Sequence, residues 1–264
     1  MLRISDLAIK PTLLAVSLLA AAAAGQGVSA ETAHPDAIQV LVERGVEIVD
    51  QFDAPGGMTG YVGTMRGKPV SFYLTNDKKH VVIGPMLSDT GENITETNIR
   101  QAITGPQNAE AWSKLEDSAW VRDGDESAPV VIYTFTDPNC PFCHRFREAA
   151  EPWIKAGRVQ LRHVMVGILK QDSLPKAATI LGADDPESAL KVNQSSYGNG
   201  GIEVDREIVS ANHKRVTANN SLMNNLGLSA TPSTFYKVDD GTIAVKQGVP
   251  RPEELAGMMG SSRP

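Results

Sequence analysis

The stretch "FTDPNCPFCHRF", residues 135–146, contains both cysteines of this 264-residue chain, Cys140 and Cys143. Two cysteines separated by two residues after a strand-like run are typical of a thiol–disulfide redox centre. With His144 directly behind them, the same residues also match the C-x-x-C-H pattern of c-type haem attachment. A soft-metal site is a third alternative, although three ligands within five residues are too few to complete a structural zinc site.

The first 30 residues have the pattern of a secretory signal peptide. Arg3 and Lys10 form a positive n-region, residues 12–25 form a short apolar run, and "VSA" at 28–30 is a small-x-small cleavage site. We expect cleavage after Ala30 and an exported mature chain. An uncleaved membrane anchor is the alternative, but the apolar run is too short to span a bilayer comfortably.

The cysteine spacing indicates chemistry rather than structure. Exported proteins enter an oxidising compartment, where cysteines usually form structural disulfides. A disulfide between Cys140 and Cys143 closes almost no loop, so it would stabilise the fold very little. The net charge of −6 is spread along the chain and gives no electrostatic case for binding nucleic acid or an anionic membrane.

A reactive cysteine must be a thiolate and must be reachable. At the first turn of a helix, unpaired N–H groups and the helix dipole favour negative charge on Cys140. Pro141 suits that turn because its missing N–H would have no partner there. We therefore expect Cys140 to be the nucleophile and Cys143 the resolving thiol that releases a mixed disulfide. Pro141 and Phe142 would tune the redox poise.

The elements around the motif predict how the thiols are positioned. "VVIYTF" at 130–135 is typical of a central buried strand, and the motif opens a helix that Pro152 should kink. An alternating strand at 159–166, a mainly helical region at about 171–226 with a break at 197–201, a β-hairpin and a closing helix follow. This order predicts a thioredoxin-like α/β domain with a helical insertion over residues 123–264.

The dipeptide Thr231-Pro232 in "SATPSTFY" precedes the predicted hairpin. In a thioredoxin fold this position holds a cis-proline that faces the two cysteines, and the residue before it pairs with extended substrate. We therefore expect a cis bond and a substrate-binding role for Thr231 and Pro232, although an ordinary trans turn proline is far commoner.

Residues 31–92 predict a smaller unit of one helix and an antiparallel sheet, of a cystatin-like kind. A helix at 35–44 precedes strand-like runs at 46–52, 59–65, 69–75 and 80–84. A unit of about 60 residues is marginally stable alone, and its sheet edges must be covered or paired. We expect a dimerisation domain, hence an α+β protein of two domains. Helices at 93–104, ended by "GP", and 107–120 form a linker over 93–122.

The remaining chemistry-bearing residues predict no metal site and no cofactor. A haem would need an axial ligand, but methionines more often fill cores; Met58, Met165 and Met223 are examples. We expect His144 to face solvent on its helix. The other histidines are interpreted as ordinary surface or strand residues: His34, His80, His163 and His213.

Two residues before the motif have specific expectations. Asp137 should support the turn into the helix rather than act as a base. Thr134 lies six residues before Cys140, where thioredoxins carry a buried acid. The strand therefore offers no carboxylate to take the proton of Cys143.

Four longer motifs resemble the DsbC/DsbG family of periplasmic thiol–disulfide proteins, most closely its DsbG branch. They are "FDAPGGMTGYVG", "TDPNCPFC", "VQLRHVMVGILK" and "LMNNLGLSATPSTFY". The resemblance covers residues 35–260 and implies a periplasmic, V-shaped homodimer paired through the sheet edges of its N-terminal domains. It matches the family's redox cysteines to Cys140 and Cys143, and its Thr–cis-Pro to Thr231 and Pro232.

The resemblance also implies partners and reactions. A membrane-bound thiol reductant of the DsbD kind would keep the protein reduced. Its substrates would be oxidised or misfolded exported proteins, in which it rearranges wrong disulfides. The DsbG branch also reduces sulfenic acids, and some members bind clients as chaperones do. Phe142 stands where DsbG typically has tyrosine, which puts the redox poise in doubt.

Three other functions remain open from the sequence. A monomeric oxidase of the DsbA type is the nearest enzyme, but the extra first domain argues against it. A holdase chaperone without redox chemistry is the non-enzymatic alternative. A c-type haem protein is the third, because C-P-F-C-H matches the attachment pattern in full.

Overall fold

A computed structural model describes residues 34–264, so the predicted signal peptide lies outside the described residues. Within them, no helix has both the length and the apolar character needed to cross a membrane. The strands form two sheets, one of four strands and one of five.

The four-stranded sheet has the predicted combination of one helix and antiparallel strands. Helix α1 packs through Ile38 against a core that includes Tyr61 and Phe72. The strands pair antiparallel in the order β1-β2-β3-β4. Gly56 and Gly57, both with a φ of 72°, make the turn between β1 and β2. The bounds are α1 Asp36–Glu43, β1 Val46–Ala54, η1 Pro55–Gly57, β2 Met58–Met65, β3 Lys68–Leu74 and β4 Val81–Ile83.

The predicted helix break at residues 105–106 is wrong. Helix α2 (Ile94–Ile99) continues through a π-helical turn, η2 (Arg100–Thr104), directly into α3 (Gly105–Glu116). The Gly105 N–H bonds to the carbonyl of Arg100, five residues back. This wider turn accommodates Pro106, which has no N–H to offer a regular helix.

The predicted helix at 107–120 is wrong at its end. Ser118 donates to the Leu115 carbonyl from its hydroxyl at 2.8 Å and its N–H at 3.2 Å, and the helix ends at Glu116. Trp120 therefore lies in a strand, β5 (Trp120–Asp123), which pairs antiparallel with β7. The last residues of the predicted linker thus belong to the second sheet.

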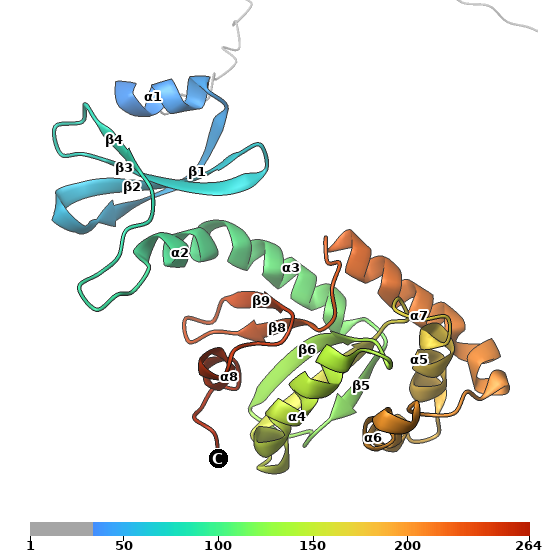
Figure 1. The fold of residues 1–264 in the computed structure, drawn as a ribbon. Helices are drawn as coiled ribbons and strands as arrows, with labels where there is room; N and C mark the ends of the chain where they lie inside the picture. Colours follow the sequence, from blue (N-terminus) through green and yellow to red (C-terminus); the bar gives the residue numbers. More distant parts are fainter. Residues whose placement is uncertain (1–33) are drawn as a thin grey trace, which may run out of the picture. The chain divides into compact units, whose positions relative to one another are not determined.

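The five-stranded sheet has the order β5-β7-β6-β8-β9, with β6 and β7 parallel and in its interior. On β6, Tyr133 and Phe135 pack in a core with α3, whereas Ile132 packs with α4 and α8. Helices therefore cover both faces of β6 (Figure 1), which explains its continuous apolar sequence. The bounds are β6 Val130–Thr136, α4 Pro141–Lys155, β7 Val159–Met165, β8 Ser233–Lys237, β9 Ile243–Gln247 and α8 Pro252–Met258.

One strand of this domain differs from the expected pattern. Strand β7 does not alternate in burial, because cores lie on both of its faces: Leu161 packs with α4 and α8, and Val164 packs with α3. Gln160 and His163 are both buried there: Gln160 donates to the Asp125 carbonyl at 2.9 Å, and Nδ1 of His163 lies 2.9 Å from the Thr136 hydroxyl. Helix α4 continues through Pro152 to its end, and the kink expected at this proline stays a prediction.

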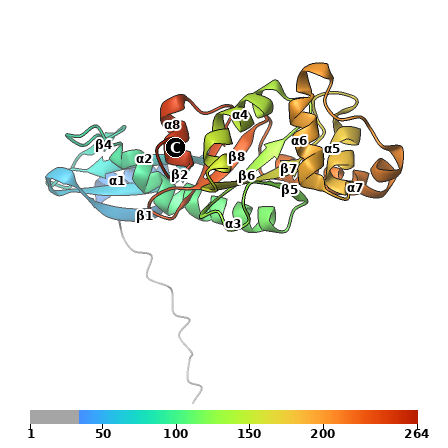
Figure 2. The ribbon, with the colours of Figure 1, turned by 90° about the horizontal axis from the view of Figure 1, so that it is seen from below.

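The region 171–226 is helical, as expected, with a break near 197–201. Helices α5, α6 and α7 gather beside β5 in both ribbon views, and Figure 2 shows β7 next to it (Figures 1 and 2). Their core joins Ile180 and Val216 to Val121 of β5 and Met165 of β7. The insertion therefore packs against the β5 end of the sheet, and Met223 of α7 also joins the core that contains Leu115 of α3. The bounds are α5 Ser173–Gly182, α6 Pro186–Ser195, η3 Tyr197–Asn199 and α7 Arg206–Asn225.

Two phenylalanines on α4 test the packing of this helix against β6 and α8. Phe146 is 1% exposed in the core between β6, α4 and α8, whereas Phe142 is 49% exposed. We expect Phe146→Ala to lower the free energy of unfolding by about 3–5 kcal/mol through lost burial and a cavity. Phe142→Ala should change it by less than about 1 kcal/mol. Urea denaturation of both variants measures this, and equal losses would contradict the packing.

Candidate redox site

The two cysteines lie at the start of α4, as the sequence predicts. Strand β6 ends at Thr136, and a short turn leads to Cys140, which is the N-cap of the helix. Its sulfur accepts the backbone N–H of Cys143 at 3.2 Å. Pro141 is the first helical residue, where its lack of an N–H costs no hydrogen bond.

The surroundings of Cys140 stabilise its thiolate. A hydrogen bond from the Cys143 thiol is the largest cause, and burial opposes it; backbone N–H groups of Cys143 and Phe142 add to the effect. Together they lower the pKa of Cys140 from 9.0 to about 6. Most of a thiol with this pKa is thiolate at neutral pH, and thiolate is the nucleophilic form.

Cys143 has the opposite character. It is 3% exposed, and its sulfur lies 3.9 Å from the Phe135 carbonyl. Burial raises its pKa well above the usual value, and the neighbouring Cys140 raises it further. The pair thus consists of one thiolate and one neutral thiol, as a nucleophile and a resolving cysteine require.

Thr231 and Pro232 lie at the same site. The peptide bond between them is cis, as expected. The Cys140 sulfur lies 3.3 Å from the Thr231 carbonyl, across 91 positions of sequence, and donates to it when the thiol is protonated. The Thr231 hydroxyl is buried without a hydrogen-bond partner within the described residues, although it lies near enough to both thiols to lower their pKa values.

The expectation that Cys140 is freely reachable is not met here. The residue is 2% exposed, and the Thr231 carbonyl contacts its sulfur. A substrate sulfur must therefore displace this contact before it can meet the thiolate.

Asp137 supports the turn, as predicted, and connects it to a second segment. Its Oδ1 accepts the N–H of Asn139 at 2.8 Å and the hydroxyl of Ser173 at 2.8 Å. Its Oδ2 accepts the N–H groups of Ile168 and Leu169 at 2.8 and 3.0 Å. These four bonds leave the carboxylate in a structural position.

The expectation that His144 faces solvent is wrong. Its ring stacks on Tyr197 at 4.5 Å, and its Nδ1 lies 2.7 Å from Oε1 of Gln194. Nε2 is 3.4 Å from Glu148. The insertion covers this side of α4 and supplies the partner of Nδ1, while Nε2 has its partner within α4. A haem attached through both sulfurs would also need Cys143 to be reachable, and Cys143 is buried.

The other residues named from the sequence have ordinary surroundings. Met165 and Met223 are buried core residues, as expected of methionine. His80 pairs with Asp77 at the surface. In the part of the chain that the structure describes, no cluster of three or more His, Cys, Asp or Glu side chains could hold a metal ion.

Thr134 is buried, and its hydroxyl lies 3.2 Å from that of Thr234. A buried carboxylate that sequence reasoning missed lies on β5. Asp123 accepts from Nε of Arg147 on α4 at 2.8 Å and lies 3.6 Å from Nε2 of His163. Burial favours its neutral form, but these two contacts outweigh burial and hold the pKa of Asp123 well below its usual range. The cluster fastens α4 to β5.

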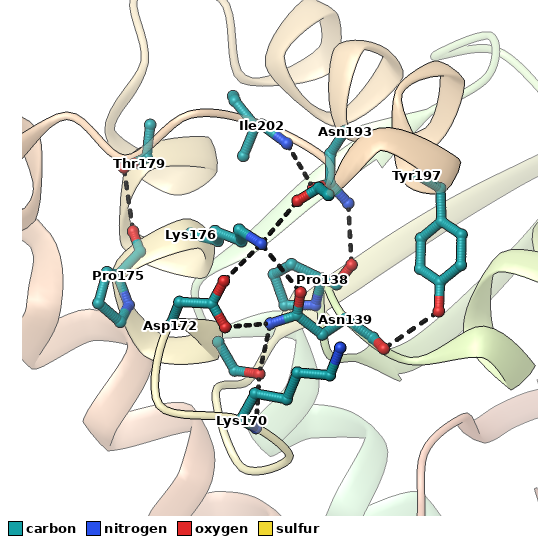
Figure 3. A network of polar contacts seen from close by, with 12 residues as sticks. Pro138, Asn139, Lys170, Asp172, Pro175, Lys176, Thr179, Asn193, Tyr197 and Ile202 are labelled. Carbon is teal, nitrogen blue, oxygen red and sulfur yellow. Dashed lines mark hydrogen bonds and ion pairs between the residues drawn. The ribbon is translucent and has the colours of Figure 1, made fainter.

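Sequence reasoning also missed a polar network next to Cys140. Asn139 contacts Lys176, Asp172 and Tyr197 of the segment from α5 to η3 (Figure 3). Only one signal was available: Lys176 interrupts the apolar sequence "LPKAATILG" of α5.

Comparison with known proteins defines first the class and then the family. Residues 122–262 match the model of a thioredoxin-like domain. The chain is 38% identical over 226 residues to a thiol:disulfide interchange protein DsbG of Pseudomonas aeruginosa, covering 86% of this chain and 88% of that one. It is 37% identical over 227 residues to the protein of the same name in Escherichia coli, covering 86% and 92%.

The chain therefore belongs to the DsbG family of thiol:disulfide interchange proteins, as its motifs predicted. It is an enzyme, an oxidoreductase of the disulfide isomerase kind. Among solved structures, the thiol-disulfide exchange protein alpha-DsbA2 of Wolbachia pipientis aligns with a TM-score of 0.49 and 15% identity, covering 64% of this chain and 98% of that chain.

The hydrogen bond from Cys143 can be tested by titration. In the reduced protein, alkylation of Cys140 by iodoacetamide should rise with a midpoint near pH 6, because only the thiolate reacts. Cys143→Ala removes the largest cause of the low pKa, so the midpoint should move to higher pH. Cys143→Ser keeps a hydroxyl donor and should stay nearer to the wild type. An unchanged midpoint in Cys143→Ala would contradict this assignment.

Proposed function

We propose that this protein is a periplasmic disulfide isomerase and reductase that acts through Cys140 and Cys143. The observation that supports this most strongly is the contrast between the two thiols. Cys140 is a thiolate at neutral pH, whereas Cys143 is buried and neutral. Its relatives are named thiol:disulfide interchange proteins, which fits this division of roles.

The first step is attack of the Cys140 thiolate on one sulfur of a substrate disulfide. The substrate S–S bond breaks, its other sulfur leaves as a thiolate, and a mixed disulfide with Cys140 forms. If the freed substrate thiolate attacks another disulfide of the same client, the client is rearranged. Cys140 then leaves unchanged, with no net oxidation.

The second route is resolution by Cys143. Once Cys140 is in a mixed disulfide it carries no charge, so one of the causes that raise the pKa of Cys143 is gone. Cys143 loses its proton to the departing substrate thiolate and attacks Cys140. The client leaves as a dithiol, and the enzyme holds a Cys140–Cys143 disulfide. A membrane-bound thiol reductant of the DsbD kind would supply the two electrons that restore it.

The same thiolate can act on a sulfenic acid. Attack of Cys140 on the client sulfur displaces hydroxide, which becomes water, and forms the same mixed disulfide. Cys143 then releases the client as a thiol. This reaction needs no second cysteine in the client.

The surface beside the motif supports a protein substrate. Phe142 is exposed, and so are Ile168 and Leu169, whose amides are bound by Asp137 in the turn before Cys140. Thr231 and Pro232 would bind an extended client segment, and the unpartnered Thr231 hydroxyl offers a donor or acceptor. The clients would be oxidised or misfolded exported proteins. Exposed apolar residues of this kind are also suited to binding such clients as a chaperone does.

Trapping tests the roles of the two cysteines. Cys143→Ala cannot resolve mixed disulfides, so we expect client adducts at Cys140 on non-reducing gels of periplasmic extract. The double variant with Cys140→Ser and Cys143→Ala should form no adducts, because it lacks the nucleophilic thiol. Clients with several cysteines favour isomerisation, and clients with one cysteine favour sulfenic-acid reduction. Adducts that persist without Cys140 would refute the assignment.

We further propose a homodimer paired through the edge of the four-stranded sheet. Strand β4 is an edge strand, and its Val82 and Ile83 are 52% and 69% exposed. An exposed apolar edge strand is suited to pairing with a second chain. A dimer would also shield the thiols from an oxidising partner protein. A monomeric oxidase, in contrast, must contact such a partner.

Sedimentation of edge variants tests the dimer. We expect the wild type to be a dimer at micromolar concentration and Ile83→Lys to be a monomer, because a charge at the paired edge must be desolvated. Val192→Lys is the control, since Val192 is exposed on α6. A monomeric wild type would contradict the dimer and favour the oxidase alternative.

A further inference from the structure

Asn139, the residue directly before Cys140, forms hydrogen bonds to the insertion through its side chain and its carbonyl. Nδ2 of Asn139 donates to Oδ1 of Asp172 at 3.0 Å and to the hydroxyl of Ser173 at 2.9 Å. Its carbonyl accepts the hydroxyl of Tyr197 at 3.2 Å, and its Oδ1 accepts Nζ of Lys176 at 3.0 Å. Figure 3 shows these contacts converging on Asn139.

Lys176 is the buried cation of this network. It is 7% exposed on α5, next to the buried Ala177. Nζ makes three contacts: Oδ1 of Asn139 at 3.0 Å, the carbonyl of Gly200 at 2.6 Å, and Oδ2 of Asp172 at 2.6 Å. These use the three donors of an ammonium group. The ion pair is also the largest cause that lowers the pKa of Asp172.

A buried lysine is uncommon, because removing an ammonium group from water is costly unless it is paired and hydrogen-bonded. Here the partners come from two separate parts of the chain. Asp172 and Gly200 belong to the insertion, whereas Asn139 belongs to the turn that presents the nucleophile. Lys176 therefore connects the insertion to Asn139, the residue directly before Cys140.

We propose that Lys176 is a positioning residue for the redox reaction, which holds Asn139 and thereby fixes Cys140 at the N-terminus of α4. This inference rests on Cys140 as the reactive thiol of the proposed function. The sulfur accepts the N–H of Cys143 only while Cys140 keeps its extended N-cap conformation, with φ −81° and ψ 115°. If Asn139 loses its side-chain anchor, the turn gains freedom and the sulfur spends less time in that position.

The route through Asn139 can be separated from a direct electrostatic effect. Titratable groups near Cys140 include Cys143 and His144 on α4, Asp137 in the turn and Tyr197 in η3. The Lys176 ammonium contacts Asn139, Gly200 and Asp172, and none of these contacts is to Cys140. An effect of Lys176 on Cys140 should therefore disappear when Asn139 is already absent.

The test measures the alkylation rate of Cys140 against pH in reduced protein. Lys176→Met keeps much of the side-chain length but removes the charge and the donors. We expect its rate at pH 6 to fall about threefold, because a higher pKa leaves less thiolate at that pH. Lys191→Met is the matched control: Lys191 lies on α6 and pairs with Glu187 at the surface. It should keep the wild-type profile.

Asn139→Ala should lower the rate in the same way, and Lys176→Met combined with Asn139→Ala should lower it no further, because the two act through one contact. If Lys176→Met does not fold, Asp172→Ala replaces it, since Asp172 is half exposed and contacts both residues. A wild-type profile in the folded variant, additive losses in the double variant, or an equal fall in Lys191→Met would overturn the inference. A wild type with no thiol titrating near pH 6 would instead refute the proposed function.

Discussion

The site depends on one interaction, the hydrogen bonding that the start of α4 gives to the sulfur of Cys140. The sulfur accepts the Cys143 N–H at 3.2 Å, and the Cys143 thiol is the largest cause of its low pKa. Burial alone would favour the neutral thiol. The structure therefore has to keep Cys140 at the helix N-terminus, and several distant parts of the chain contribute to that.

Support reaches Cys140 from three directions. Strand β6, buried on both faces, ends four residues before it, and Asp137 closes the turn between them. The Thr231 carbonyl contacts the sulfur from the loop before β8. The helical insertion holds Asn139 through Lys176 and stacks Tyr197 on His144, so it contacts the motif on both sides. The insertion is thus part of the redox site, and it does more than extend the fold.

Much of this could be predicted from the sequence, because the relevant signals are local. The apolar strand, the proline after Cys140 and the Thr-Pro before a hairpin each have a steric or hydrogen-bonding reason, and all three are found as expected. The errors arose where tertiary contacts override local pattern. A π-turn carries the helix through Pro106, Trp120 joins a sheet through its pairing with β7, and His144 is covered by η3. Lys176 and Asp123 were missed because burial of a charge depends on partners far away in sequence.

A stabilised Cys140 thiolate favours the reduced state and so makes the reduction potential of the couple less negative. For a two-electron couple, a tenfold change in the equilibrium constant corresponds to about 30 mV. A thiol with a pKa of about 6 is more fully ionised at pH 7 than that of thioredoxin, whose pKa is about 7 and whose potential is about −270 mV. The most direct measurement is equilibration of the Cys140–Cys143 couple with glutathione at pH 7. We expect a potential less negative than about −250 mV, and a potential at or below about −270 mV would contradict a stabilised Cys140 thiolate.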